Sequence, residues 1–229
     1  MKLRAQISRL PLVRPLAVRY RYYRITRSFP GSAHYWEQRY RSGGNSGAGS
    51  YNRLAHFKAE TVNAFVREKS VATVIEFGCG DGNQLKLAHY PRYVGVDIAP
   101  WAIEHCRLIF KDDSSKQFSL PDNTPARSAE LALSLDVIYH LVEDDVFHHY
   151  MEKLCDSASR YIIIYSSNTE TYNYKFQDPH VRHRCFSDWI KQHRPQWKLL
   201  RHLPHPFPYK PEDAQNTSLS EFFFYEKKA

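Results

Sequence analysis

Residues 74–85 read Val-Ile-Glu-Phe-Gly-Cys-Gly-Asp-Gly-Asn-Gln-Leu, and residues 93–100 read Tyr-Val-Gly-Val-Asp-Ile-Ala-Pro. The first apolar run leads into three glycines at alternate positions, after which we expect a helix to begin near Asn83. The second apolar run ends on a carboxylate, Asp97. Alternating glycines let the backbone approach a ligand closely, and an acid at the next strand end can accept both hydroxyls of a ribose. The stretch therefore predicts a nucleoside pocket.

The acids near the glycines indicate which nucleoside is bound. A diphosphate is favoured at a helix N-terminus, where the helix dipole and the free amides attract negative charge. Glu76 and Asp81 lie inside or beside the glycine turn, and two carboxylates there would repel a diphosphate. S-adenosylmethionine has a ribose, a sulfonium and an ammonium group but no phosphate. The charges therefore favour this cofactor over a dinucleotide such as NAD.

The chain resembles the class I S-adenosylmethionine-dependent methyltransferases. Residues 76–82 match the first motif of that family, acid-x-Gly-x-Gly-x-Gly, and residues 134–141 (Ser-Leu-Asp-Val-Ile-Tyr-His-Leu) are similar to its fourth-strand motif. The likeness is close over residues 71–166 and looser beyond them. It implies a Rossmann-like, doubly wound α/β fold, with a mostly parallel seven-stranded sheet, helices on both faces and a terminal antiparallel strand hairpin.

Hydrophobic periodicity agrees with such a fold and predicts one methyltransferase domain over residues 34–229, after a basic extension over residues 1–33. Within the domain, residues 34–70 are expected to form a helical cap over the cofactor site. We expect strands at 74–77, 93–96, 117–120, 129–135, 161–165, 197–203 and 222–225, and helices at 34–40, 54–66, 100–110, 143–154 and 188–193.

The resemblance implies a set of cofactor-binding residues at the carboxyl ends of the strands. The glycines would let the loop approach the cofactor, Asp97 would bind the ribose hydroxyls and Ile98 would pack on the adenine. Asp122, after the third strand, would accept a hydrogen bond from the adenine amino group. The full predicted set is Glu76, Gly78, Cys79, Gly80, Gly82, Asp97, Ile98, Asp122 and Asp136.

Methyl transfer requires the acceptor to be held close, aligned and desolvated. An amine acceptor needs only to be unprotonated, whereas a sugar hydroxyl needs a base or a metal. The candidate bases are His140, at the end of the fourth strand, and His180 and His183, which follow the fifth strand. An alternative for His140 is that it positions the backbone or closes the cofactor pocket.

Five further residues are candidates for binding the acceptor substrate. Tyr35 and Trp36 belong to the cap, and their rings either face the sulfonium or pack the cap onto the core. Tyr139 lies beside His140. Arg182 and Arg184 flank His183, and these arginines either hold a phosphate or carboxylate of the acceptor or form a salt-bridged surface loop.

Charge and cysteine content limit the remaining possibilities. Residues 1–30 contain eight basic and no acidic residues, while the rest of the chain is balanced, so the net charge of +8 belongs to the extension. Such a segment is either solvated, bound at an anionic membrane surface or bound to nucleic acid. The four cysteines are scattered, which favours a reducing cytoplasmic location. A zinc site from His180, His183 and Cys185 lacks a recognisable fourth ligand, so we expect no metal.

These observations predict an enzyme that uses S-adenosylmethionine to methylate an oxygen or nitrogen of a small molecule or glycan precursor. One alternative is a nucleic-acid methyltransferase that uses the basic extension, although residues 134–137 lack the Asn/Asp-Pro-Pro-aromatic signature of enzymes that methylate base amino groups. Another alternative is a non-catalytic protein that binds S-adenosylmethionine.

Overall fold

The computed structural model describes residues 29–123, 129–170 and 178–228. Most of the expected basic extension, residues 1–28, lies outside these ranges. Across the described ranges, no helix combines the length and the apolar character needed to cross a membrane.

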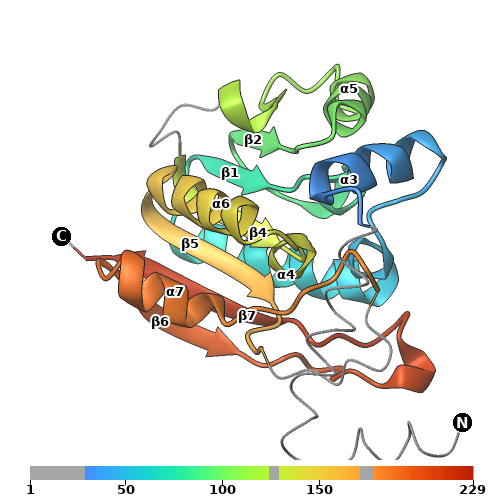
Figure 1. Ribbon diagram of the computed structural model, residues 1–229. Coiled ribbons are helices and arrows are strands. Elements are labelled where there is room, and N and C mark those ends of the chain that lie inside the picture. Colours follow the sequence, from blue (N-terminus) through green and yellow to red (C-terminus); the bar gives the residue numbers. More distant parts are fainter. Residues whose placement is uncertain (1–28, 124–128, 171–177, 229) are drawn as a thin grey trace, which may run out of the picture.

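Seven strands form a single sheet in the order β3-β2-β1-β4-β5-β7-β6 (Figure 1). The first five strands in this order run parallel, and β7 is antiparallel to both of its neighbours. This is the mostly parallel sheet with a terminal antiparallel hairpin that the sequence predicts. The strands are β1 (Val74–Phe77), β2 (Tyr93–Val96), β3 (Lys116–Ser119), β4 (Ala129–Leu135), β5 (Ala158–Ser166), β6 (Trp197–Leu203) and β7 (Glu221–Lys227).

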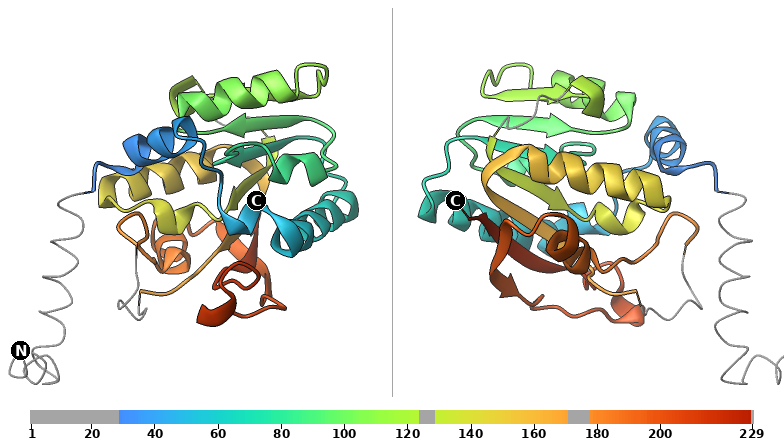
Figure 2. Two further views of the ribbon diagram at one scale, coloured as in Figure 1. Left: turned by 90° about the vertical axis from the view of Figure 1, so that its right-hand side faces the viewer. Right: turned by 60° about the vertical axis from the view of Figure 1, so that its left-hand side comes forward.

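Helices cover both faces of the sheet (Figures 1 and 2). One buried apolar cluster joins α4 and α5 to the sheet, and a second cluster on the opposite face joins α6 and α7 to it. Alternating side chains of the central strands supply the two clusters, as expected for a sheet that is covered twice. The helices are α3 (Ser32–Arg41), α4 (Asn52–Glu68), α5 (Pro100–Ile109), α6 (Asp144–Asp156) and α7 (Phe186–His193).

The helix expected after the glycine turn is much shorter than the sequence suggests. Only a four-residue 3-10 helix, η2 (Gln84–Leu87), forms there, and Ala88 already has an extended backbone. Pro91 disfavours a helical conformation in the residue before it, and β2 begins two residues later. The chain therefore reaches β2 without room for a full helix.

The strand order places a ligand crevice at the carboxyl ends of β1 and β4. The chain proceeds from β1 outward to β2 and β3, and then returns to the other side of β1 as β4. Ligands of open α/β sheets bind where the strand order reverses in this way. Gly78, Asp97 and Asp136, which follow β1, β2 and β4, meet at this edge of the sheet.

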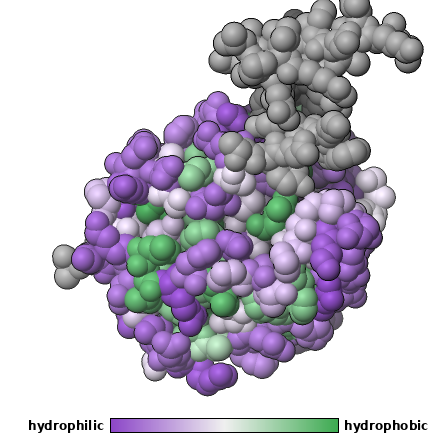
Figure 3. Space-filling view, turned by 90° about the horizontal axis from the view of Figure 1, so that it is seen from below, coloured by the Kyte–Doolittle hydropathy of each residue, from purple (hydrophilic) through white to green (hydrophobic). Residues whose placement is uncertain are grey.

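The strand β6 is one edge of the sheet, and much of it is exposed. Leu199 and Leu200 on this strand are 53% and 45% exposed. The view from below in Figure 3 shows apolar residues lying among polar ones on this face. Lys198, Arg201 and His202 supply polar side chains on the same strand, and charged groups on an edge strand oppose pairing with a second chain.

Glu76 is a buried acid in the middle of this apolar sheet. It belongs to β1 and is 4% exposed, and its carboxyl accepts a hydrogen bond of 2.7 Å from the hydroxyl of Tyr93 on β2. Burial raises the pKa of Glu76 from its ordinary 4.5 to about 7, although the Tyr93 hydrogen bond opposes the shift. Part of the Glu76 population is therefore protonated near neutral pH.

We expect Glu76→Gln to change how stability depends on pH. Folded Glu76 holds its proton more tightly than unfolded Glu76, so the resulting stabilisation is complete below the unfolded pKa and is lost as the pH rises through about 7. The glutamine of the variant does not titrate. Urea unfolding should therefore show the stability of wild type falling relative to the variant by up to about 3 kcal/mol as the pH is raised from about 5 to about 8. Parallel pH profiles for the two proteins would contradict this account.

Candidate active site

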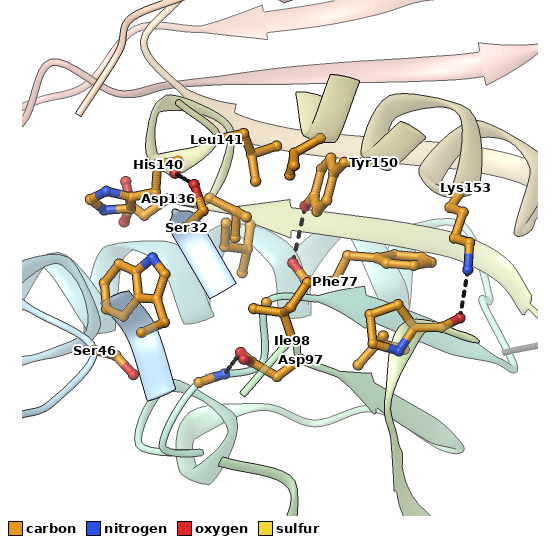
Figure 4. A pocket seen from close by; sticks show the side chains of 18 of the residues that line it. Ser32, Ser46, Phe77, Asp97, Ile98, Asp136, His140, Leu141, Tyr150 and Lys153 are labelled. Carbon is orange, nitrogen blue, oxygen red and sulfur yellow. Dashed lines mark hydrogen bonds between the residues drawn. The ribbon is translucent and has the colours of Figure 1, made fainter. Parts of the chain in front are cut away.

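A cavity of about 440 Å³ opens at the carboxyl ends of β1, β2 and β4 (Figure 4). Most of its lining is apolar, with a small number of polar groups, as in small-molecule sites generally. Seven of the residues predicted for cofactor, acceptor or catalysis line it. They are Trp36, Gly78, Gly80, Asp97, Ile98, Asp136 and His140.

The turn after β1 leaves no room for side chains at two of its glycines. Gly78 has φ +87°, and a Cβ atom there would lie 2.3 Å from the Cγ2 atom of Val137. Gly80 has φ +57°, and its Cβ would lie 2.3 Å from the Oγ atom of Ser46. Both positions combine a left-handed backbone with close neighbours, which only glycine tolerates. The turn therefore brings bare backbone to the cavity wall.

Asp97 supports the turn and also lines the cavity. Its Oδ2 atom accepts a hydrogen bond of 2.9 Å from the backbone N–H of Gly80, and its Oδ1 atom accepts one of 2.9 Å from the backbone N–H of Ala99. Burial raises the pKa of Asp97 to about 6, against the effect of these hydrogen bonds. A carboxylate has roughly four lone-pair sites, so Asp97 keeps capacity for ribose hydroxyls.

The next residue, Ile98, presents apolar surface at the cavity. It is 45% exposed although it lies beside buried Asp97. Across the cavity, Tyr150 and Lys153 project from α6 (Figure 4). The Lys153 ammonium donates a hydrogen bond of 2.9 Å to the carbonyl oxygen of Pro121, and so fastens the segment after β3 to α6. A flat apolar ring between Ile98 and α6 would bury the exposed side chain of Ile98.

Four predicted cofactor residues do not line the cavity. Glu76 lies within the sheet, hydrogen-bonded to Tyr93. Cys79 is buried in the core, and Gly82 packs against α5 and the residue after it. The Asp122 side chain is 94% exposed and pairs with Lys153 at 3.3 Å. The geometry therefore gives Asp122 an ion-pair partner in place of the predicted adenine contact.

The segment between α3 and α4 is tied to the glycine turn. The Ser46 N–H donates to Asp81 Oδ2 at 2.9 Å, and the Asp81 N–H donates to Ser46 Oγ at 3.0 Å. The hydroxyl of Tyr51 donates to the same Asp81 oxygen at 2.9 Å. Asp81 therefore holds the cap on the turn, and does not itself line the cavity.

The helix α3 closes the cavity from the side of His140. The hydroxyl of Ser32 donates to the His140 carbonyl oxygen at 2.9 Å and contacts the Glu143 carboxylate at 2.6 Å. Trp36 and Tyr40, further along α3, also line the cavity. The sequence pointed to the rings of Trp36 and Tyr40 but missed the contribution of Ser32, because only the tertiary structure shows which face of α3 is turned inward.

His140 ends the 3-10 helix η4 (Ile138–His140), directly after β4. Its Nδ1 atom lies 3.0 Å from the carbonyl oxygen of His180. A carbonyl oxygen only accepts hydrogen bonds, so Nδ1 carries the proton and Nε2 offers a lone pair. Burial lowers the pKa of His140 from 6.5 to about 3, so the imidazole is neutral at physiological pH.

Other aromatic rings pack around His140. Its ring stacks on that of His180 with centroids 5.3 Å apart, and His180 stacks in turn on Tyr35 at 4.4 Å. The Trp36 ring meets His140 edge-on at 4.9 Å. The predicted base His180 and the predicted substrate residue Tyr35 thus form a wall behind His140 and do not line the cavity.

His183 and Tyr139 also lie behind His140. The Nδ1 atom of His183 is 2.6 Å from the hydroxyl oxygen of Ser167, and burial lowers the pKa of His183 to about 4. The Tyr139 ring lies 4.4 Å from the ring of His140 and 5.9 Å from that of His183, between centroids. Its hydroxyl donates to Asp136 at 3.0 Å. Neither side chain lines the cavity.

The two predicted substrate arginines support the backbone after η4. Arg184 is 8% exposed and donates to the carbonyl oxygens of Leu141 and Val142 at 3.0 and 2.9 Å. Arg182 donates to the same Val142 oxygen at 2.9 Å. Both guanidinium groups pair with Asp144, at 2.8 Å for Arg182 and 2.7 Å for Arg184. The geometry gives these arginines a structural role in place of the predicted anion site.

The histidine segment is not arranged as a metal site. Among the residues that the structure describes, no three or more His, Cys, Asp or Glu side chains are placed to hold a metal ion. Cys185, the suggested third zinc ligand, instead donates through its Sγ atom to Asp188 at 3.2 Å.

Comparison with known proteins identifies the family. A family model described as a methyltransferase domain matches residues 50–208. The chain belongs to this methyltransferase family. The sequence-based prediction of a class I S-adenosylmethionine-dependent methyltransferase, with S-adenosylmethionine as its cofactor, is thereby confirmed.

A curated relative and several solved structures resemble this methyltransferase. A small RNA 2′-O-methyltransferase of Arabidopsis thaliana is 26% identical over 176 residues, which are 69% of this chain but only 18% of the plant protein. Among solved structures, the methyltransferase domain of bacterial CtHen1-C has a TM-score of 0.57 at 19% identity, covering 75% of this chain and 97% of that one.

Two further solved structures of methyltransferases resemble the chain in fold. Magnesium protoporphyrin IX methyltransferase of Synechocystis PCC 6803, with bound S-adenosylhomocysteine, has a TM-score of 0.58 at 14% identity and covers 77% of this chain and 85% of that one. N-methyltransferase NodS of Bradyrhizobium japonicum WM9 has a TM-score of 0.58 at 14% identity and covers 76% and 88%. At these identities the likeness shows a shared fold, and the predicted fold class is confirmed.

The cavity fits the cofactor of this family. Bare backbone at Gly78 and Gly80 offers close approach, Asp97 offers carboxylate oxygens and Ile98 offers an exposed apolar surface. The cavity volume of about 440 Å³ is in the range of ligand pockets. Asp97, Asp136 and Asp145 also line it together with one lysine, Lys153, so acidic side chains outnumber basic ones on its wall and favour a ligand with positive charge.

We expect cofactor affinity to depend on the ionisation of Asp97. Its pKa of about 6 in the free protein means that protonation removes an acceptor for ribose hydroxyls as the pH falls below that value. Calorimetric titration with S-adenosylhomocysteine should therefore show affinity falling by up to about tenfold per pH unit below about pH 6.

The matched variant is Asp97→Asn, whose amide donates where Asp97 only accepts. It should bind S-adenosylhomocysteine weakly and with a flat pH profile, while circular dichroism verifies that both proteins stay folded. Equal affinity of the wild type at about pH 5 and about pH 8 would refute a ribose-binding role for Asp97.

Proposed function

We propose that this methyltransferase transfers the methyl group of S-adenosylmethionine to a sugar hydroxyl of a small molecule or glycan precursor. The observation that carries the proposal is the state of His140. His140 lines the cavity, and its Nδ1 proton is held by the His180 carbonyl oxygen, which leaves Nε2 as a neutral acceptor. A hydroxyl acceptor must lose a proton during transfer, whereas a neutral amine can react without a base.

Different residues around the cavity bind the cofactor, exclude water and accept the proton in such a reaction. S-adenosylmethionine, when bound, supplies a methyl group on a positively charged sulfur. The glycine turn, Asp97 and Ile98 hold the nucleoside, and α3 excludes water from the side of His140. His140 accepts a hydrogen bond from the acceptor hydroxyl, orients its oxygen and takes the proton as the hydroxyl reacts. The low pKa of His140 keeps Nε2 unprotonated before the reaction, and the nearby Asp136 charge favours the positive charge that the ring gains when it takes the proton.

Charge supports a small acceptor over a long polyanion. Residues 31–229 contain equal numbers of basic and acidic residues, and the carboxylates of Asp97, Asp136 and Asp145 line the cavity. A nucleic-acid site usually has a basic surface that contacts many phosphates. The balanced charge of the domain therefore supports a small-molecule enzyme, and a cytoplasmic location is part of this proposal.

RNA is the second candidate acceptor, and one observation favours it. The relative from Arabidopsis thaliana is named as an enzyme that methylates a 2′-hydroxyl of small RNA, which is also a sugar hydroxyl. Tight RNA binding with a steep salt dependence, lost when residues 1–28 are deleted, would favour RNA over a small acceptor. Contact of these basic residues with an anionic membrane is the competing proposal for the extension, tested by sedimentation with anionic vesicles.

A thermal-shift panel tests the cofactor side of the proposal. At a concentration about 100 times its dissociation constant, a ligand stabilises the folded protein by about 2.7 kcal/mol. We expect S-adenosylmethionine and S-adenosylhomocysteine to raise the melting temperature, and NAD and ATP to leave it unchanged. A response to NAD or ATP alone would overturn the proposal.

Turnover of His140→Gln tests the role of the histidine. Methyl transfer from labelled S-adenosylmethionine to fractionated small molecules and glycan precursors should fall by about 100-fold in the variant, because its amide is a far weaker proton acceptor. Affinity for S-adenosylhomocysteine should stay within about twofold of wild type. Full turnover by the variant, or transfer only to amines, would rule out hydroxyl methylation through His140.

A further inference from the structure

Side chains from three segments meet at the carboxylate of Asp136. The Lys58 ammonium, on α4, lies 2.7 Å from Asp136 Oδ2. The hydroxyls of Tyr139, on η4, and Ser220, just before β7, donate to Oδ1 at 3.0 and 2.9 Å. Lys58 is 1% exposed and Ser220 is 2% exposed. A buried ammonium is costly unless it is paired, so Lys58 fixes the negative charge of Asp136 at this point.

The backbone of Asp136 is itself strained. Its φ is +60°, a left-handed conformation that is uncommon outside glycine. Such strain persists only when surrounding contacts hold it, and it is concentrated at functional sites. Here the N–H of Asp136 donates to the carbonyl oxygen of Tyr165 at 2.8 Å, in addition to the three side-chain contacts of its carboxylate.

Tyr139 connects the carboxylate of Asp136 to His140, the candidate base. The tyrosine ring packs on the ring of His140 with centroids 4.4 Å apart. The Tyr139 carbonyl oxygen accepts a hydrogen bond of 2.7 Å from the backbone N–H of Arg182, within the segment that carries His180. Burial and the nearby Asp136 charge raise the pKa of Tyr139. The hydroxyl therefore stays protonated and donates to Asp136.

We propose that Lys58, Asp136 and Tyr139 form a buried positioning chain that holds the His140 ring in the orientation in which its Nδ1 proton meets the His180 carbonyl oxygen. The inference rests on the proposed function of His140 as proton acceptor. Lys58 fixes the carboxylate, the carboxylate fixes the Tyr139 hydroxyl, and the tyrosine ring supports the imidazole. Lys58 and Tyr139 do not line the cavity and act on the reaction only through His140, so they are positioning residues. Asp136 has this role as well as lining the cavity.

Ser220 offers a matched control for Tyr139. Tyr139 and Ser220 donate to the same oxygen at nearly the same distance, but only Tyr139 packs on His140. Tyr139→Phe and Ser220→Ala each delete one hydroxyl and its hydrogen bond to Asp136, and each also removes the contact between these two hydroxyls. If these hydrogen bonds only stabilise the fold, the two variants should behave alike. If the Tyr139 hydroxyl positions His140, only Tyr139→Phe should change the state of the imidazole.

The first measurement is the 15N NMR spectrum of the histidine rings, with the His140 signals assigned by their loss in His140→Gln. Wild type should show one fixed tautomer with the proton on Nδ1. We expect Tyr139→Phe to give averaged nitrogen shifts, and Ser220→Ala to keep the wild-type pattern. This readout needs neither cofactor nor acceptor, so it can fail or succeed independently of the proposed function.

The second measurement is methyl transfer to the hydroxyl acceptor. Tyr139→Phe should lower kcat by about tenfold while its affinity for S-adenosylhomocysteine stays within about twofold of wild type. Ser220→Ala should retain kcat within about twofold. Equal effects of the two variants on the His140 spectrum, or an unchanged spectrum in Tyr139→Phe, would overturn the positioning chain. If the wild-type protein does not bind S-adenosylhomocysteine, the proposed function would be overturned instead.

Lys58→Met extends the test to Lys58, the first member of the positioning chain, since methionine has a similar length without the charge. We expect its His140 spectrum to resemble that of Tyr139→Phe, because the Asp136 carboxylate loses its counter-ion. A folded Lys58→Met protein with the wild-type tautomer would remove Lys58 from the chain. If this variant does not fold, the comparison of Tyr139→Phe with Ser220→Ala still decides the proposal.

Discussion

The shape of the cofactor site depends on the hydrogen bonds that hold the turn after β1 to the end of β2. The backbone N–H groups of Gly78 and Cys79 both donate to the carbonyl oxygen of Val96, and the N–H of Gly80 donates to the Asp97 carboxylate. The turn is therefore fixed before any ligand arrives, at the point where the strand order reverses. The same acid that is suited to ribose also preforms the loop, which lowers the entropy cost of binding.

The sequence predicted most of the architecture because its signals there are local. Strand runs, the Pro100 start of α5 and the acidic first turn of α6 depend on neighbours a few residues apart, and the structure has each of them. After the glycine turn the sequence predicted a helix beginning near Asn83, and the structure has only a four-residue 3-10 helix there, because Pro91 disfavours a longer one. The roles of Arg182 and Arg184 depend on carbonyl oxygens some 40 residues away, which no local pattern reveals.

The charge argument from the sequence led to the correct cofactor although it placed the charges differently. Of the two acids near the turn, Glu76 lies in the sheet beside Tyr93, and Asp81 is bound by Ser46 of the cap. The carboxylates that line the cavity follow β2 and β4 or belong to α6, and are those of Asp97, Asp136 and Asp145. The negative character of the site is thus a property of the sheet edge as a whole, and only part of it is visible in the motif.

The contacts of the first described residues set the place from which the basic segment departs. The Phe29 ring lies 5.9 Å from that of Tyr35, which stacks on His180, and Ser32 is bound to the His140 carbonyl oxygen. The described part of the chain therefore begins beside the rings that pack behind His140. If residues 1–28 bind an anionic surface or polymer, as proposed above, that ligand is tethered to this end of α3, which raises its effective concentration near the cavity.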